Sequence, residues 1–385
     1  MAETLFANIP TIESIKRLGL EKSDSSFAIL LDMFTQEELG VDIRREIVSS
    51  IGRQKNNDKI YEFLNREAFS NHYMEVIYQM FRTCLYKSKE DARFADLRDR
   101  ILRHYNNEVM QKMLEYSIFR QQKKMSLKPQ RKILKPSLLV GDNRITLNKI
   151  QEQQIQLIFT SPPYYNARLY SDYKSYHDYL DSMKDTLKQC YRILENGRFI
   201  LINVSPVITK RAGREFESIR YPIHFDFHKI LCDSGFYFID EIIWIKPEYS
   251  VPNRIAGYLQ TKKPLSYKPN CITESIMVYR KNTPFLLDKN IRDYDKNLKN
   301  DDEIDSTNCW YIAPKFDKNH PAVFPEELCQ KVLKYYSFKG DVVCDPFAGS
   351  GTFGKVANTM GRIPLLCEQN LDYAEKLKQR GFDEI

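Results

Sequence analysis

The spacing of apolar residues changes near position 122. Up to that point apolar positions recur every three or four residues, which is the period of one face of an α-helix, and no proline follows Pro10. Beyond residue 136, short apolar runs typical of buried strands alternate with longer stretches of helical period. The two patterns predict an all-α domain over 1–122 and an α/β domain over 137–385, joined by a linker at 123–136.

The second domain is predicted to be a three-layer, doubly wound and mostly parallel sheet, because strands and helices alternate along it. The expected strands are Leu138–Val140, Ile155–Phe159, Arg198–Val204, Tyr237–Ile245, Glu274–Tyr279, Val342–Cys344 and Ile363–Cys367. The expected helices are Tyr176–Leu194, Pro222–Asp233, Pro325–Tyr336, Lys355–Met360 and Asp372–Arg380.

The first domain contains three helical stretches roughly thirty to thirty-five residues apart, Ile43–Ile51, Met74–Phe81 and Val109–Leu114, with a further helical pattern between them. This spacing predicts a short array of helical hairpins similar to HEAT repeats, although the period is below the usual range. An ordinary helical bundle would also accommodate three irregular units.

Composition sets broad limits on the protein. The net charge of +7 and the pI near 8.8 suit a polyanionic partner without requiring one. The eight cysteines are scattered and include no C-x-x-C pair, so neither a disulfide framework nor a metal site is expected. The chain has no apolar run of membrane-spanning length and no signal-peptide pattern, so we expect a cytoplasmic protein.

Basic residues gather in two segments. The linker holds six of them without an acidic residue: Lys123, Lys124, Lys128, Arg131, Lys132 and Lys135. It is either a solvated hinge or a strap along a nucleic-acid backbone, where each cationic contact releases counterions. A second group, Lys210, Arg211 and Arg214, follows the strand Arg198–Val204 and is expected to contact phosphates or an extruded base.

The strand Ile155–Phe159 ends in Thr160-Ser161-Pro162-Pro163-Tyr164-Tyr165. The two prolines fix φ and lack N–H donors, so the turn presents carbonyl and hydroxyl oxygens. These oxygens can accept hydrogen bonds from an amino group while Tyr164 stacks on the ring that carries it. The turn therefore predicts a site for a base of the cytosine or adenine type, and a plain strand stop made by two prolines is the alternative.

The strand Val342–Cys344 runs into the small-residue turn Asp345–Thr352, and a helical pattern follows from Phe353 to Thr359. Strand, glycine turn and helix together allow a nucleoside to approach backbone N–H groups. The glycines do not have the G-x-G-x-x-G spacing of a dinucleotide site. One strand later, Glu368 is placed to accept ribose hydroxyls, so a nucleoside cofactor is predicted, with an ordinary surface acid as the alternative for Glu368.

Together the two turns resemble those of the amino-methyltransferases that modify exocyclic nitrogens of DNA bases with S-adenosyl-L-methionine. Ser161-Pro162-Pro163-Tyr164 is similar to the catalytic motif of that family, and Phe347–Thr352 is similar to its cofactor loop. Three further stretches match in order: Gly141-Asp142, Trp244-Ile245-Lys246-Pro247 and His320-Pro321-Ala322-Val323-Phe324-Pro325. The resemblance covers roughly residues 136–382.

In this chain the catalytic turn precedes the cofactor loop, which is the circularly permuted order of the β class. The resemblance implies a class I methyltransferase fold with one antiparallel strand inserted at an edge of the sheet, here Glu274–Tyr279. It also implies a target-recognition region at about Tyr249–Trp310. The two turns are expected to meet at the carboxyl ends of the strands, where strand order reverses.

The resemblance implies a role for each site residue. Ser161 and the Pro162 carbonyl would hold the amino group of an extruded base, and Tyr164 would stack on it, with Pro163 completing the turn. Glu368 would bind the ribose, the N–H groups of Phe347, Gly349 and Gly351 the methionine part, and Asp142 the adenine, unless Asp142 is only a turn residue. The full set of implied cofactor contacts is Asp142, Thr160, Ser161, His320, Asp345, Phe347, Ala348, Gly349, Ser350, Gly351, Thr352 and Glu368. The implied DNA contacts are Lys128, Arg131, Lys132, Lys210, Arg211 and Arg214. Trp244 is expected to be a core residue.

Serine at the first motif position is common among N4-cytosine enzymes of the family, whereas Asp or Asn marks N6-adenine enzymes. N4 of cytosine in duplex DNA is therefore the favoured target, and N6 of adenine is the alternative. A non-catalytic DNA-binding scaffold is a second alternative, which the intact turns and Glu368 speak against. No nuclease constellation is apparent, so a restriction endonuclease partner would be a separate protein.

The helical domain lies outside the part of the chain that the resemblance covers. A repeat array leaves an extended face free for a partner, so we expect it to help to clamp DNA. Dimerisation or simple stabilisation is the rival interpretation, and both a monomer and a dimer fit the pattern.

Overall fold

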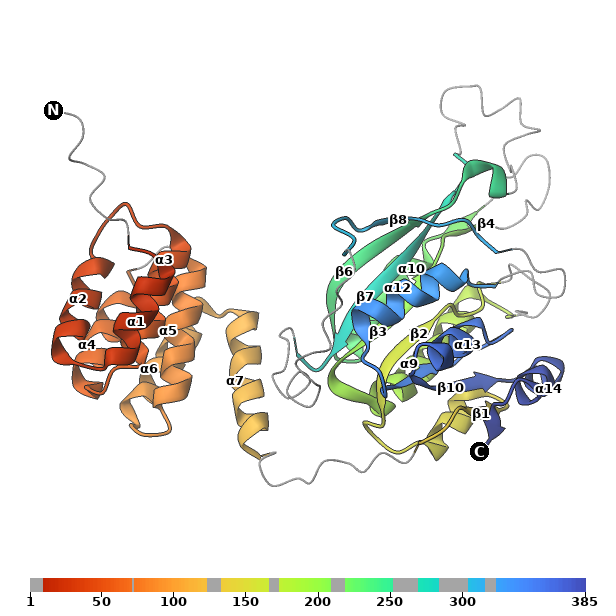
Figure 1. Cartoon of the computed structure of the whole chain (residues 1–385), viewed down its shortest axis with the longest axis horizontal. Coiled ribbons are helices and arrows are strands. Elements are labelled where there is room, and N and C mark those ends of the chain that lie inside the picture. Colours follow the sequence, from red (N-terminus) through yellow and green to blue (C-terminus); the bar gives the residue numbers. More distant parts are fainter. Residues whose placement is uncertain are drawn as a thin grey trace. The chain divides into compact units, whose positions relative to one another are not determined.

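The computed structural model describes residues 10–70, 73–122, 133–165, 173–208, 219–251, 269–283, 304–315 and 323–385 (Figure 1). The chain divides into two compact units, Met1–Ser126 and Leu127–Ile385. Each unit has a hydrophobic core of its own.

The described part of the first unit consists of helices. They are α1 (Ile12–Glu21), α2 (Asp24–Phe34), α3 (Val41–Gly52), α4 (Asn57–Glu67), α5 (Met74–Lys87), α6 (Arg93–Tyr105) and α7 (Glu108–Gln122). Helices α1, α3, α5 and α7 pack one on the next, and α4 packs on α6, so alternate helices form successive layers of hairpins. The all-α prediction for this region is confirmed.

Contacts between successive hairpins repeat along the first unit. Lys59 Nζ lies 3.3 Å from Asp24, and Arg93 lies 2.7 Å from Asp58, in each case 35 residues apart along the chain. Arg100 donates to Asn65 at the same separation. Equal spacing of equivalent contacts indicates hairpins stacked with one period. Membership of the HEAT class stays a prediction.

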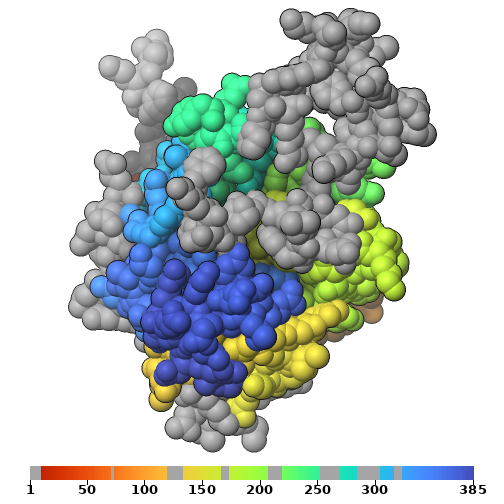
Figure 2. Space-filling model, turned by 90° about the vertical axis from the view of Figure 1, so that its right-hand side faces the viewer, coloured from red at the N-terminus to blue at the C-terminus, as the bar shows by residue number. Residues whose placement is uncertain are grey.

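The second unit is built on a nine-stranded sheet. Its strands are β1 (Ser137–Val140), β2 (Ile155–Thr160), β3 (Leu194–Val204), β6 (Phe236–Ile245), β7 (Thr273–Lys281), β8 (Cys309–Tyr311), β9 (Val342–Asp345), β10 (Ile363–Glu368) and β11 (Asp383–Glu384), in the order β11-β1-β10-β9-β2-β3-β7-β6-β8. Two short strands, β4 (Val207–Ile208) and β5 (Arg220–Tyr221), form a separate antiparallel pair. In Figure 2 the blue C-terminal residues lie beside the yellow segment that begins with β1, as the parallel pairing of β1 with β10 requires.

All neighbouring strands of this sheet are parallel except the two pairs that include β7. The predicted antiparallel orientation of β7 is confirmed, but its predicted position at an edge is wrong. It lies between β3 and β6, because β6 pairs along nearly the whole of β7 and β8 adds a further strand outside β6.

Helices cover both faces of the sheet (Figure 1). Strand residues such as Ile158 and Ile200 share a core with α9 (Tyr176–Ile193) and α10 (Ile223–Asp233). Their neighbours Leu157 and Phe159 point to the opposite face, toward α12 (Glu326–Tyr336) and α13 (Thr352–Thr359). Alternate burial of this kind gives the predicted three layers, with α14 (Leu371–Gln379) closing the sheet beside β1 and β10. The helices within the described residues are all too short or too polar to cross a membrane.

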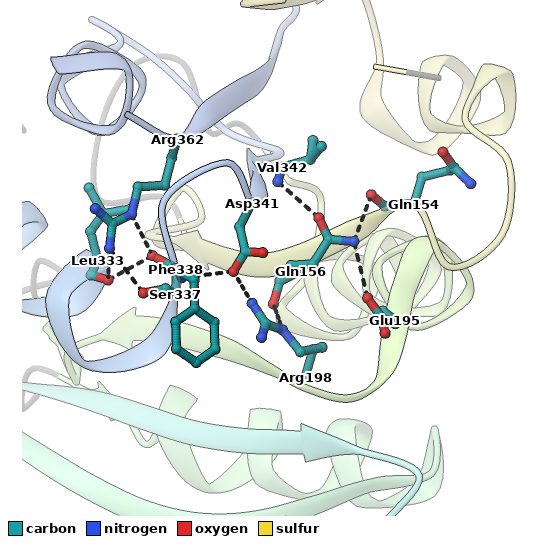
Figure 3. A network of polar contacts seen from close by, with 10 residues as sticks. All are labelled: Gln154, Gln156, Glu195, Arg198, Leu333, Ser337, Phe338, Asp341, Val342 and Arg362. Atoms are coloured by element: carbon teal, nitrogen blue, oxygen red, sulfur yellow. Dashed lines mark hydrogen bonds and ion pairs between the residues drawn. The ribbon is translucent and has the colours of Figure 1, made fainter. Parts of the chain in front are cut away.

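A buried polar network joins the amino-terminal ends of the central strands (Figure 3). Arg198 of β3 forms an ion pair with Asp341, which precedes β9, and its Nε donates to the Gln156 carbonyl of β2 at 2.9 Å. The Gln156 side chain accepts from the Val342 N–H at 2.9 Å. The network ties three neighbouring strands together at the edge of the sheet opposite to the predicted site.

Candidate active site

The two predicted turns leave adjacent strands at one edge of the sheet. Strands β2 and β9 pair in parallel, so the turn after Thr160 and the turn after Asp345 begin side by side. The helix after β2 covers one face of the sheet and the helix after β9 covers the other, which makes this the point where the winding reverses. Thr160 Oγ1 donates to Asp345 Oδ1 at 2.7 Å and joins the two turns directly. The sequence-based expectation that the turns meet at a reversal point is met.

Asp345 is a buried carboxyl group at the end of β9. Its Oδ1 accepts from Thr160 and also from the Phe347 N–H at 3.0 Å. Burial raises the pKa of Asp345 to about 7, although these two hydrogen bonds favour the ionised form. A carboxyl group with a pKa near 7 is only partly ionised at neutral pH. A cation that binds beside it favours the ionised form.

Glu368 lies at the end of β10, the next strand. Its carboxylate accepts from the Gly349 N–H at 2.7 Å and from the Asn370 N–H at 2.8 Å, while burial raises its pKa. Each carboxylate oxygen can accept a second hydrogen bond, so the group retains capacity for a ligand hydroxyl. Glu368 therefore shapes the loop Asp345–Thr352 and keeps unused acceptor capacity.

The amides assigned to the methionine part of the cofactor are already engaged within the loop. The Phe347 N–H donates to Asp345, the Gly349 N–H to Glu368, and the Gly351 N–H to the Ala348 carbonyl. The loop as described thus offers carboxylate acceptors rather than these three free N–H donors. Two of the acceptors, Asp345 and Ala348, belong to the loop itself, and only Glu368 comes from another strand.

Small residues are required where the loop enters α13. Gly351 has φ 75° and is the N-cap of the helix, and a Cβ atom there would lie 2.2 Å from Leu377 Cδ2. Ser350 and Thr352 share a hydroxyl contact of 3.2 Å, and the Ser350 carbonyl accepts from Arg380 at 2.6 Å. The Ala348 N–H donates to the Cys367 carbonyl of β10, which closes the loop onto the neighbouring strand.

Asp142 and Asn143 follow β1 on the far side of β10. Asp142 caps the short helix α8 (Asn143–Thr146) and pairs with Arg144, which lowers the pKa of the Asp142 carboxyl. Asn143, which the motif comparison passed over, is buried; it donates to the Pro346 carbonyl and accepts from Thr186, both at 2.8 Å. The observed bonds of Asp142 are those of a turn residue, and a contact with adenine remains a prediction.

The Ser161 hydroxyl has a defined polarity. It donates to the Asn203 carbonyl of β3 at 3.1 Å, and the Asn203 side-chain N–H approaches its oxygen at 3.4 Å. Because its single proton is directed to a backbone carbonyl, the remaining lone pairs can only accept. Pro162 is buried and Pro163 half-buried beside it.

Three donors converge on Glu274, the second residue of β7. The Tyr164 hydroxyl donates to Glu274 Oε2 at 3.0 Å, the Asn203 side-chain amide donates to the same oxygen, and Lys246 forms an ion pair with Oε1. Burial, and secondly the Glu274 charge, raise the pKa of Tyr164 well above its usual value. Sequence reasoning missed Asn203 and Glu274, and the only available signal was a charged residue inside a predicted strand.

Trp244 occupies the position expected of it. It is buried, and its Nε1–H donates to the Ile312 carbonyl at 2.8 Å, so the prediction of a core residue is confirmed. His320, all six predicted DNA contacts (Lys128, Arg131, Lys132, Lys210, Arg211 and Arg214) and most of the predicted target-recognition region lie outside the described residues.

The described site is suited to a ligand that carries positive charge and hydroxyl donors. Asp345 is buried and Glu368 is half-buried, and desolvation raises the pKa of both carboxyl groups. A cation between them would offset the cost of ionisation, whereas an anion such as a phosphate would increase it. An acceptor turn built from Ser161 and Pro162 stands on the adjacent strand. Strand order, loop position and acceptor chemistry together define a class I methyltransferase.

Comparison with known proteins agrees with that class. Residues 155–379 match the DNA methylase family that groups N6 and N4 methyltransferases, and the chain belongs to this family. The matched segment includes the acceptor turn, the cofactor loop and Glu368.

The similar proteins share less than a third of their aligned residues with this chain. The chain is 27% identical over 270 residues to the type II beta methyltransferase M.BslI of Bacillus sp. (strain NEB-606), which covers 64% of this chain and 28% of that protein. It is 29% identical over 268 residues to the type II methyltransferase M.HpaI of Haemophilus parainfluenzae, with 64% and 76% covered. The structure of TTHA0409, a putative DNA modification methylase of Thermus thermophilus, is 27% identical and aligns with a TM-score of 0.50 over 65% of this chain and 98% of that one.

Proposed function

We propose that this protein transfers a methyl group from S-adenosyl-L-methionine to the exocyclic N4 of cytosine in duplex DNA, at specific sites and on an extruded base. The observation that carries the proposal is the polarity of Ser161. Its proton is directed to the Asn203 carbonyl, so it presents an acceptor at the edge of the sheet where the buried Asp345 also lies.

The acceptor turn acts on the amino group of the base. Ser161 Oγ and the Pro162 carbonyl accept hydrogen bonds from the two N–H groups of the base. This arrangement points the lone pair of the amino nitrogen away from the turn. The Tyr164 ring stacks on the base, and its hydroxyl is held by Glu274. No strong base is required, because the amino proton becomes acidic only as the new N–C bond forms. Orientation of this kind can supply several kcal/mol of the barrier reduction, on the order of 7 in favourable cases.

The residues around the cofactor loop suit S-adenosyl-L-methionine. This cofactor supplies an electrophilic methyl group on a sulfonium sulfur. Glu368 would accept the ribose hydroxyls, and Asp345 would face the positively charged methionine part. Both carboxylates would then be held ionised, which their raised pKa values otherwise oppose.

The distribution of charge supports a polyanionic partner for the second unit. Residues 127–385 contain 38 lysines and arginines against 32 aspartates and glutamates, whereas residues 1–126 contain 20 against 19. Phosphate contacts, which dominate affinity for DNA, are therefore expected mainly in the second unit, including the linker residues from Lys128 onward. We infer that the helical array contributes shape rather than charge to DNA binding.

Mass spectrometry of nucleosides tests the reaction. DNA of mixed sequence is incubated with the protein and S-adenosyl-L-methionine, then digested and analysed. We expect N4-methylcytosine from the wild type and from Ser117→Ala, a control in α7 of the first unit, and none from Ser161→Ala. N6-methyladenine without N4-methylcytosine would contradict the assigned base and support the adenine alternative.

Calorimetric titration with S-adenosyl-L-methionine separates an enzyme from a scaffold. A binding isotherm is expected for the wild type and for the control Ser117→Ala. No heat and no thermal shift with either protein would favour the non-catalytic DNA-binding scaffold.

A further inference from the structure

We propose that Glu274 is a positioning residue for methyl transfer, which holds Tyr164 and Asn203 in the arrangement that the acceptor turn needs. This inference rests on the proposed function. Glu274 belongs to β7, a strand that lies outside the acceptor turn and outside the cofactor loop.

The topology explains why Glu274 reaches the site. Strands β2 and β3 run toward the edge where the turns lie, whereas β7 runs in the opposite direction. The first residues of β7 therefore stand at the edge where its neighbours end. Glu274 is paired in register with Trp244 of β6, and the next residue, Ser275, is paired with Val204 of β3. An antiparallel strand inside the sheet thus brings an acidic side chain beside Ser161.

The two oxygens of the carboxylate have separate partners. Oε1 is paired with Lys246, whose ammonium group also lies 4.8 Å from the centre of the Trp244 ring. Trp244 is itself fixed by its bond to the Ile312 carbonyl. Oε2 is left for the Tyr164 hydroxyl and the Asn203 amide. Lys246 thus neutralises and orients Glu274, and Glu274 in turn orients the two groups that flank Ser161.

Two consequences follow for the acceptor turn. A carboxylate only accepts hydrogen bonds, so it requires the Asn203 N–H₂ group to face it and turns Asn203 Oδ1 away. Among the described residues that buried Oδ1 has no hydrogen-bond partner. Tyr164, meanwhile, is held at its hydroxyl as well as by its backbone, so its ring keeps one plane for stacking. A neutral amide at position 274 could accept from one of the two groups but would no longer dictate the orientation of both.

A double-mutant cycle tests the inference. Glu274→Gln, Tyr164→Phe and the double variant are compared with Glu248→Gln, which removes an exposed acidic charge at the same edge of the sheet. Loss of a hydrogen bond to a charged group lowers rates by about tenfold to a hundredfold. We expect such a fall in kcat for Glu274→Gln, with the KM for DNA and the Kd for S-adenosyl-L-methionine nearly unchanged, and a wild-type rate for Glu248→Gln. The double variant should be no slower than about the slower single variant, because both changes break one link.

Four results would overturn the inference. Additive losses in the double variant would show that Glu274 does not act through Tyr164. A lower melting temperature with weaker cofactor binding in Glu274→Gln would show a merely structural role. If the wild type and Glu274→Gln are equally active, Glu274 is not a positioning residue, and the proposed function stands. If the wild type binds the cofactor but is inactive, the proposed function fails, and this inference fails with it.

Discussion

Replacing Asp345 with asparagine should make the free protein more stable and its cofactor site weaker. Burial raises the pKa of this carboxyl from 3.8 to about 7. Each unit of pKa difference between the folded and unfolded chain corresponds to about 1.4 kcal/mol. Keeping Asp345 ionised in the folded protein above pH 7 therefore costs on the order of 4 kcal/mol.

The direction of the pH effect follows from that shift. Between about pH 4 and pH 7 the folded protein binds the Asp345 proton more tightly than the unfolded chain does, so stability falls as the pH rises through this range. The asparagine side chain would still offer an oxygen to Thr160 and to the Phe347 N–H without carrying charge. We expect the variant to lose this pH dependence and to gain about 2–4 kcal/mol in unfolding free energy at pH 8, less whatever the weaker neutral hydrogen bonds subtract.

The same substitution should weaken binding of S-adenosyl-L-methionine, because the cation loses a buried opposite charge. In the wild type, affinity should rise as the pH increases through about 7, where Asp345 becomes ionised. If the substitution stabilises the free protein and weakens cofactor binding, the ionised Asp345 carboxylate destabilises the fold and contributes to binding.

The assay can be confined to the second unit. Both tryptophans of the chain, Trp244 and Trp310, are buried there, so their fluorescence during denaturant unfolding reports that unit. Unfolding is followed from pH 5 to pH 8, and cofactor affinity is measured by calorimetry. Asp185→Asn, which changes an exposed carboxyl of α9, is the matched control. Equal pH dependence of unfolding in the wild type and in Asp345→Asn would refute the reasoning.

Three further outcomes are expected. Gly351→Ala should cost about 1–3 kcal/mol more than Gly340→Ala in tryptophan-monitored unfolding, because both sites have positive φ but only the first would place a Cβ atom against Leu377; equal losses would contradict this. Arg198→Met should cost about 3–5 kcal/mol in the same assay, since it leaves Asp341 buried without its charge partner, and a smaller loss when Asp341→Leu is added is the check. Deletion of residues 1–122 should preserve cofactor binding and weaken DNA binding, while neutralising the linker lysines should reduce the salt dependence measured by fluorescence anisotropy; unchanged DNA affinity in a folded truncation would argue against a clamp.

Local patterns of the sequence were enough to predict most elements of the fold. The strand Ile155–Thr160 was expected one residue shorter, and the helix Tyr176–Ile193 one residue longer, than they are. Runs of apolar residues, paired prolines and glycine turns act over a few neighbouring positions, so they can be interpreted without knowing what lies across the sheet. The positions of the turn after β2, the small-residue loop after β9 and the acidic residue at the end of β10 were all predicted in this way.

The contacts within the site depended on the tertiary structure. Thr160 and Asp345 are 185 residues apart, and Tyr164 and Glu274 are 110 apart, so no local pattern relates the members of either pair. The interior position of β7, the raised pKa of Asp345 and the direction of the Ser161 proton each result from which strands are neighbours. Hydrogen bonds and burial depend on which groups are close in space, and the strand order of the sheet determines which side chains are neighbours.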